Sequence, residues 1–251
     1  MKLWPLGRPN NKTSRELVMN TTKKMLLAIG FVGAVGATAS ASAAVINGSF
    51  ENNLSNWTTF GTVGTTNASA TNGMSSALIT AVDNGAYNAP ALESFAGITD
   101  VALQAIKSGY KDFTTGSAIK QTFSATAGDK FSFDYRTLTN ESITSPWDFT
   151  FVVIDGVALA LGDTNINSGF GAGVAGYETA NSWKTFTQTF ASTGNHTITF
   201  GAFQAGDNSV STALLVDNVK AVPEPTTVAL LGLGLLGFAA SRRKSAKNKN
   251  A

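Results

Sequence analysis

Cysteine is absent from the 251 residues of the chain, and His196 is its only histidine. Without thiols the protein can form no disulfide, no thiolate metal site and no cysteine nucleophile. A single histidine excludes a histidine-rich zinc site, and no Gly-x-Ser-x-Gly elbow is present to pair with it in a serine triad. Phosphate-loop and dinucleotide-binding fingerprints are absent as well. These absences predict a noncatalytic protein, although a pair of carboxylates, which the sequence does not single out, could still serve a glycosidase.

Basic residues are scarce in the middle of the chain. The whole sequence holds 18 Lys and Arg against 16 Asp and Glu. Residues 44–225, however, hold seven basic against fifteen acidic side chains, a formal charge of −8. Such an acidic surface argues against nucleic acids and anionic membranes as partners. It would suit divalent cations, although solvated surface charge is the commoner explanation.

The C-terminal end combines a proline-flanked motif, an apolar run and a basic cluster. Pro223 and Pro225 flank Glu224 and favour an extended backbone. Residues 226–240 carry no charge and would form a helix of about 22 Å, shorter than the ~30 Å hydrocarbon core. The basic residues 242–244 would stay in the cytoplasm and leave the proline motif on the outer side. This order predicts a weak, transient anchor.

Residues 222–246 resemble the PEP-CTERM sorting signal of exopolysaccharide-producing Gram-negative bacteria, followed by a basic tail at 247–251. The resemblance implies cleavage near Pro223-Glu224-Pro225 by an exosortase, a membrane cysteine transpeptidase. Until then the precursor would be anchored in the membrane through its hydrophobic sorting helix, 226–240. The mature protein would go to the cell surface, the outer membrane or the extracellular matrix. An ordinary C-terminal membrane anchor is the alternative explanation.

The N-terminal end has the pattern of a secretory signal peptide at 19–43. Two lysines precede an apolar stretch, and Ala41-Ser-Ala43 forms a small-residue cleavage site. Cleavage could equally follow Ala44. Residues 1–18 are expected to be surplus, from a start codon placed too early. The pattern predicts export through the Sec translocation machinery.

Between these two signals, residues 44–221 are expected to form one β-rich domain. Short runs alternate between apolar and polar residues and are separated by turn residues. The turn at 127–129 reads as a hairpin, and 148–154, apolar on both faces, predicts a central strand. The nine expected strands are 44–50, 57–62, 76–82, 119–125, 130–135, 148–154, 184–190, 196–203 and 213–222. This number is typical of an all-β jelly-roll sandwich.

Two segments depart from the β pattern. Residues 90–95 and 100–107 have helical spacing, with Asn88 and Thr99 as N-caps. They predict two short inserted helices that close the sandwich. The segment 61–73, rich in Thr, Gly and Asn, is expected to be a solvated loop.

The domain also resembles carbohydrate-binding modules with a galactose-binding-like jelly roll. Val45-Ile-Asn-Gly-Ser-Phe-Glu51, followed by Leu54 and Trp57, looks like their opening strand, and 214–219 is similar to their last strand. Four internal segments resemble a common group of PEP-CTERM domains of unassigned activity: 92–95, 116–123, 139–141 and 147–153. The resemblance implies the fold more directly than a function.

In such sandwiches the first and last strands often share a structural calcium ion. The resemblance implies that Glu51 and Asp217 supply carboxylates, completed by backbone carbonyls near Asn47 and Ser49. Calcium binds six to eight oxygens, which such a set can provide. The alternative is that Glu51 caps a turn and Asp217 binds local backbone amides.

Sugar binding requires flat aromatic faces with amide and carboxylate groups beside them. The predicted ligand-binding rim consists of Asn140, Glu141, Trp147, Asp148 and Tyr177. Trp147 stands out because it follows a proline in a polar loop. Ordinary solvation of Asn140, Glu141 and Asp148 is the alternative, and Trp57 and Trp183 are expected in the core.

Together these patterns predict an exported, exosortase-sorted, noncatalytic protein of the cell surface or biofilm matrix. Binding of exopolysaccharide is the sharper version of this hypothesis. The alternatives are a structural matrix protein without a defined ligand and a glycan-processing enzyme with an unrecognised carboxylate site.

Overall fold

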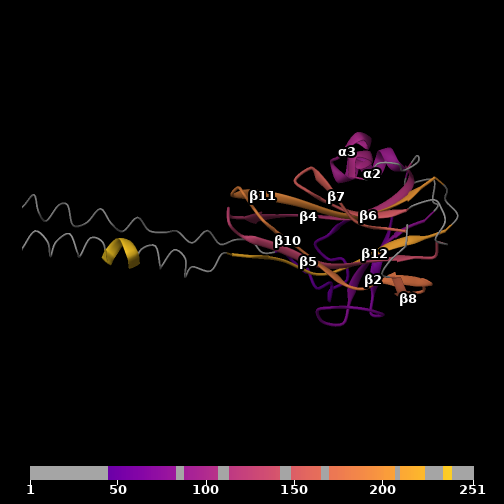
Figure 1. The fold of residues 1–251 in the computed structure, drawn as a ribbon, viewed down its shortest axis with the longest axis horizontal. Helices are drawn as coiled ribbons and strands as arrows, with labels where there is room; N and C mark the ends of the chain where they lie inside the picture. Colours follow the sequence, from indigo (N-terminus) through magenta and orange to yellow (C-terminus); the bar gives the residue numbers. More distant parts are fainter. Residues whose placement is uncertain are drawn as a thin grey trace, which may run out of the picture. The chain divides into compact units, whose positions relative to one another are not determined.

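The computed structural model describes residues 45–82, 88–106, 113–141, 148–164, 170–206, 210–223 and 234–238. Within them, antiparallel strands form two sheets, and two short helices lie on one of these sheets (Figure 1). The expected all-β sandwich with two inserted helices is therefore confirmed. The expected signal peptide lies outside the described residues, as does most of the expected sorting helix.

Sheet A has five strands and sheet B has seven. Sheet A runs β1 (Thr58–Phe60), β4 (Phe113–Ala125), β11 (Gly194–Ala205), β6 (Phe149–Ile154) and β7 (Val157–Asp163). Sheet B runs β2 (Thr62–Thr66), β3 (Ser76–Ala81), β12 (Thr212–Val222), β5 (Lys130–Thr139), β9 (Thr179–Asn181) and β8 (Phe170–Ala172). The remaining strand, β10 (Lys184–Thr189), pairs with the first part of β5.

The expectation of an opening strand at 44–50 is wrong for its described part. Residues 46–49 form turns, and the backbone φ angle is positive at Asn47 and Phe50. The Asn47 amide donates to the carbonyls of Asn53 and Ser55, at 2.9 and 3.0 Å, and holds the segment coiled. The apolar residue Phe50 suggested a strand, but it is buried from a turn. A turn can place one aromatic side chain in the core as well as a strand can.

The expected loop at 61–73 is partly a strand. Gly61 has a φ of +79° and redirects the chain from β1 in sheet A to β2 in sheet B. Residues 62–66 then pair with β3. Their Thr-rich composition is compatible with a half-exposed edge strand, so composition alone did not distinguish strand from loop.

The turn after β4 is a corner between the sheets, and the expected hairpin at 127–129 is wrong. β4 belongs to sheet A, whereas β5 belongs to sheet B. The Asp129 carboxylate accepts the N–H of Thr126 at 2.8 Å, and the N–H of Gly128 reaches across to the carbonyl of Phe190 at 2.8 Å. A short turn between two alternating runs is compatible with a hairpin within one sheet or with a corner between two sheets. Only the packing of the two sheets decides which of the two forms.

Aromatic side chains fill the space between the sheets. Phe133 of β5 meets Phe200 of β11 edge to face at 4.7 Å, and Phe131 stacks on Phe123 at 5.9 Å. Trp57 is 6% exposed and packs on Phe200, which confirms its predicted place in the core. β6, predicted as a central strand, is buried along its whole length between β11 and β7.

The two helices, α2 (Ala89–Ala96) and α3 (Asp100–Ile106), cover the outer face of sheet A. The Asn88 side chain accepts the N–H of Ala91, as an N-cap does, and Gly97 ends α2 in the left-handed conformation. Leu92 and Leu103 are fully buried in one cluster with the outward aromatic residues of sheet A. The predicted helices and their caps are confirmed.

The strands place several turns at one end of the sandwich, called here the exit end. It consists of the corner 126–129, the β6–β7 turn 155–156, the segment 191–193 and the end of β12 at Val222 (Figure 1). The opposite end carries 140–141, 163–164 and the start of β12.

Substitution of Gly201 tests how closely the buried side chains pack around Phe151. A Cβ at this position of β11 would lie 2.3 Å from a ring atom of Phe151, which is fully buried. We expect Gly201→Ala to lower the free energy of unfolding by about 1–3 kcal/mol through overpacking. The matched control is Gly64→Ala in β2, where a Cβ meets nothing within 4 Å. Urea unfolding of both variants measures the difference, and equal stabilities would contradict this packing.

Candidate functional site

The residues of the predicted ligand rim differ in burial. Asn140 and Tyr177 are half-buried: the Asn140 side-chain oxygen accepts the N–H of Glu178 at 2.7 Å, and the Tyr177 hydroxyl contacts Thr80 Oγ1 at 3.2 Å. Burial raises the pKa of the Tyr177 hydroxyl. The first contact brings Asn140, at the end of β5, next to the residue that follows Tyr177 in the chain.

The two predicted rim carboxylates are buried. Asp148 is 1% exposed, and its Oδ1 accepts the N–H of Ala205 at 3.0 Å, which ties the start of β6 to the end of β11. Glu141 is 8% exposed. Neither carboxylate is presented to solvent as a rim residue would be. Trp147 lies outside the described residues.

Trp183 lies on the outer face of sheet B, and its expected place in the inter-sheet core is wrong. Its indole is half-buried, with Nε1 donating to Ser69 Oγ at 2.9 Å and the Arg136 guanidinium 5.8 Å from the ring. Trp183 and Tyr177 pack against one cluster of buried apolar residues, named here the outer cluster: Leu138, Ala180, Ala213 and Leu215. Sequence reasoning missed this site because alternation does not tell which face of a sheet is covered.

Glu51 and Asp217, the predicted calcium ligands, both hold the loop before β3. Glu51 Oε1 accepts the N–H groups of Met74 and Ser75, each at 2.8 Å. Asp217 Oδ2 accepts those of Thr71 and Asn72, at 2.6 and 2.8 Å. The two carboxylates thus secure one loop through its backbone amides.

A second carboxylate lies directly beside Asp217. Asp134 pairs with it across β5 and β12, and the Thr71 hydroxyl lies 2.8 Å from Asp134 Oδ2 and 3.2 Å from Asp217 Oδ2. Burial raises the pKa of Asp217, against the hydrogen bonds that it accepts. Burial also acts to raise the pKa of Asp134, but hydrogen bonds from Thr185, Asn218 and Thr71 bring it below its ordinary value.

The donor set around Asp217 does not fit calcium in this arrangement. The polar contacts of Asp217 and Glu51 given above come from N–H and O–H donors, whereas calcium requires converging oxygen acceptors. The Asn47 carbonyl accepts the Trp57 indole N–H at 3.2 Å, and Ser49 lies in the same turn. No group of three or more acidic or histidine side chains able to hold a metal occurs among the described residues. The calcium site stays a prediction, and the amide contacts favour the alternative explanation.

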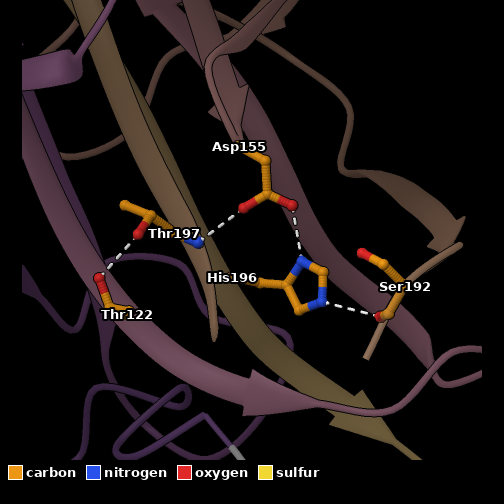
Figure 2. A network of polar contacts seen from close by, with 5 residues as sticks. All are labelled: Thr122, Asp155, Ser192, His196 and Thr197. Carbon is orange, nitrogen blue, oxygen red and sulfur yellow. Dashed lines mark hydrogen bonds and ion pairs between the residues drawn. The ribbon is translucent and has the colours of Figure 1, made fainter. Parts of the chain in front are cut away.

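The single histidine forms a buried polar group at the exit end. His196, 4% exposed at the start of β11, has Nδ1 2.6 Å from Asp155 Oδ2 and Nε2 3.1 Å from the main-chain oxygen of Ser192. Its ring stacks on Phe190 with centroids 3.9 Å apart. The other oxygen of Asp155 accepts the N–H of Thr197 at 2.9 Å. Figure 2 shows these contacts joining the β6–β7 turn to β11.

Asp155, His196 and Ser192 have the residue types of a serine triad but not its geometry. In a triad the histidine Nε2 faces the serine hydroxyl. Here the contact of Nε2 ends on the carbonyl of Ser192 (Figure 2). A carbonyl oxygen only accepts, so Nε2 carries a hydrogen and has no lone pair for the hydroxyl.

A cavity of about 250 Å³ adjoins this group, between the facing edges of the two sheets. Apolar Ile154, Val157 and Leu159 form one wall, and Gln188 of β10 lies on the other side. The cavity is open to solvent beside Asp155, which is 43% exposed. Among the described residues that line it, one is a carboxylate and none is a lysine or an arginine.

The first proline of the predicted cleavage motif follows directly after the last strand. β12 ends at Val222, and Pro223 follows directly. Glu224 and Pro225 lie outside the described residues. In the part of the chain that the structure describes, no helix is long and apolar enough to cross a membrane.

Residues 221–244 match the family model of the PEP-CTERM protein-sorting motif. The predicted sorting signal is thereby confirmed, and with it an exported, exosortase-sorted protein of Gram-negative bacteria. The search of curated proteins finds no significant match.

Several solved structures are similar to the chain, and three carry informative names. The carbohydrate-binding module TmCBM61, solved with β-1,4-galactotriose, is 14% identical with a TM-score of 0.38, covering 73% of this chain and 100% of its own. The mannan-recognising module TmCBM27 is 12% identical with a TM-score of 0.41, covering 73% and 97%. The K1 adhesin domain of Lys-gingipain from Porphyromonas gingivalis W83 is 14% identical with a TM-score of 0.39, covering 73% and 99%.

Asp217 provides a direct test of the amide contacts. We expect Asp217→Ala to lower the free energy of unfolding by about 1.5–3 kcal/mol, since buried, charge-assisted hydrogen bonds to the loop are lost. Glu178→Ala, at an exposed acid, should change it by less than about 0.5 kcal/mol. Urea unfolding measures both variants, and equal losses would contradict the contacts.

Thermal melting with calcium and with EDTA tests the metal prediction. If backbone amides are the partners of Glu51 and Asp217, the midpoint is the same in both conditions. A midpoint that rises with calcium in the wild type, and no longer does so in Glu51→Ala, would instead establish the calcium site.

Two variants test the structural role of His196 and the main-chain contact of its Nε2. We expect His196→Ala to lower the free energy of unfolding by about 1–3 kcal/mol, because Asp155 and the Ser192 carbonyl lose their partner. Ser192→Ala should leave stability unchanged, because the contact uses the main chain. A large loss of stability in Ser192→Ala, measured by urea unfolding, would contradict this geometry.

Proposed function

We propose that the mature protein is a noncatalytic, glycan-binding module of the cell surface or the exopolysaccharide matrix. The observation that carries this proposal is the position of the sorting motif, whose matched segment begins at residue 221, within the last strand of the sandwich. The sandwich is therefore the module that the signal delivers.

The outer face of sheet B supports the binding part of the proposal. Trp183 and Tyr177 lie there on the outer cluster, and Arg136 and Asn140 are near them. Half-buried aromatic rings offer apolar faces to the C–H side of a sugar ring, while amide and guanidinium groups can bond hydroxyls. The same combination of side chains is typical of concave ligand sites.

The contacts of His196 support a noncatalytic role. Both of its ring nitrogens contact oxygen atoms of neighbouring residues, and Nε2 is unavailable to a nucleophile. Asp134 and Asp217 lie near each other, but their oxygens accept hydrogen bonds from the chain itself. A glycosidase would need one carboxyl positioned as an acid and another as a nucleophile or base on the substrate.

Retention on the producer's own exopolysaccharide tests the proposal. We expect saturable, competable retention of the wild type and a loss of affinity of about tenfold or more in Trp183→Ala, as for an aromatic hot spot. Trp183→Phe should keep most of the affinity, because it retains the ring and loses only the N–H.

The matched control is Thr187→Ala, an exposed position on the same face of sheet B. It should bind as the wild type does, and thermal melting confirms that each variant is folded. Absence of retention in the wild type would favour a structural matrix protein without a defined ligand. Release of reducing sugar from the polysaccharide would favour a glycan-processing enzyme.

A further inference from the structure

The sorting motif begins inside the folded domain. The matched segment starts at residue 221, whereas β12 continues to Val222. Ala221 pairs with Phe131 and is 7% exposed in the inter-sheet core. Val222 pairs with Lys130. The first two residues of the signal are therefore held by the sheet.

The distance between the sandwich and the apolar run is short. Three residues lie between Val222 and Thr226, so the two are four Cα–Cα steps apart, and an extended chain spans at most about 3.5 Å per step, or roughly 14 Å in all. A membrane peptidase acting at 223–225 must therefore reach a peptide within that distance of the folded exit end. Burial and hydrogen bonding of the backbone near a cut site decide whether cleavage is possible.

Hydrogen bonds join most of the exit end. Phe190 exchanges main-chain hydrogen bonds with the corner after β4: Gly128 N–H donates to its carbonyl at 2.8 Å, and its own N–H donates to Asp129 O at 3.0 Å. The N–H of Ala127 donates to Thr193 Oγ1 at 2.9 Å. The contact of His196 with the β6–β7 turn closes the other side (Figure 2).

The end of β12 is the weakly held part. Residues 212–216 pair with β3 on one side and β5 on the other. Beyond them the ladder of β12 continues with β5 alone, the other edge is held by one hydrogen bond from the Val219 N–H to the Gly48 carbonyl at 2.9 Å, and the register shifts between Asp217 and Lys220. After this irregularity only residues 220–222 remain in the ladder. A terminal stretch held along one edge opens locally at low cost, while the rest of the sandwich stays folded.

We propose that the last three pairs of β12, at 220–222, must peel from β5 before the sorting motif is processed. This inference rests on the exosortase-sorting function of the chain. Because cleavage of a transiently open segment follows the population of the open form, the folded sandwich sets the processing rate. The partner is a membrane peptidase that takes an extended peptide, and the exit end is the surface it meets.

Insertion of Gly-Ser-Gly-Ser between Val222 and Pro223 of the full chain tests the proposal. In pulse–chase labelling of producing cells, the insertion should raise the rate of precursor conversion by about threefold or more, since peeling is no longer required. The sandwich should stay resistant to added protease. An unchanged or slower rate would overturn the inference.

A second pair of variants leaves the motif itself intact. Lys220 precedes the matched segment, is exposed, and belongs to the last three pairs. Lys220→Gly should speed conversion, because glycine weakens a strand, and Lys220→Val should slow it. Lys184→Gly is the matched control at an exposed lysine of β10 and should convert at the wild-type rate.

The outcomes separate this inference from the sorting function. Conversion at one common rate in the wild type, the insertion and both Lys220 variants overturns the peeling step alone. A precursor that no variant converts overturns the sorting function and the inference together. Conversion only with the insertion supports both.

Discussion

Burial of aromatic rings between the two sheets is the constraint on which the rest of the structure depends. Without disulfides, the domain must gain its stability from packing, and Phe133 against Phe200 lies at the centre of that packing. On the outer face of sheet A, under the helices, the rings likewise leave so little room that a Cβ on Gly201 would lie 2.3 Å from Phe151. Turns such as the one at Phe50 are likewise positioned by the core they help to fill.

The acidic side chains of the domain act mainly as acceptors for its own backbone. In five places a carboxylate accepts main-chain N–H groups and secures a turn or a strand end: Glu51, Asp129, Asp148, Asp155 and Asp217. Carboxylates bind amides strongly in such positions, because the hydrogen bonds are charge-assisted. The acidity of the domain is thus in part structural, and it is weak support for cation binding.

The two ends of the sandwich differ in what they offer. At the exit end, hydrogen bonds of His196, Phe190 and the corner after β4 join the turns, a cavity opens to solvent beside Asp155, and the end of β12 pairs with β5 alone. The half-buried aromatic residues, Tyr177 and Trp183, lie instead on the outer face of sheet B.

The sequence by itself determined the sorting signal, the β class, the two capped helices and the buried strand β6, because each depends on local order or periodicity. Only the tertiary structure decided which turns are corners, since β4 and β5 alternate as hairpin strands do and yet lie in different sheets. It also decided that Trp183 lies outside the inter-sheet core and that Asp148 is buried. Alternation marks one face of a strand as apolar, but what covers that face depends on segments distant in the chain.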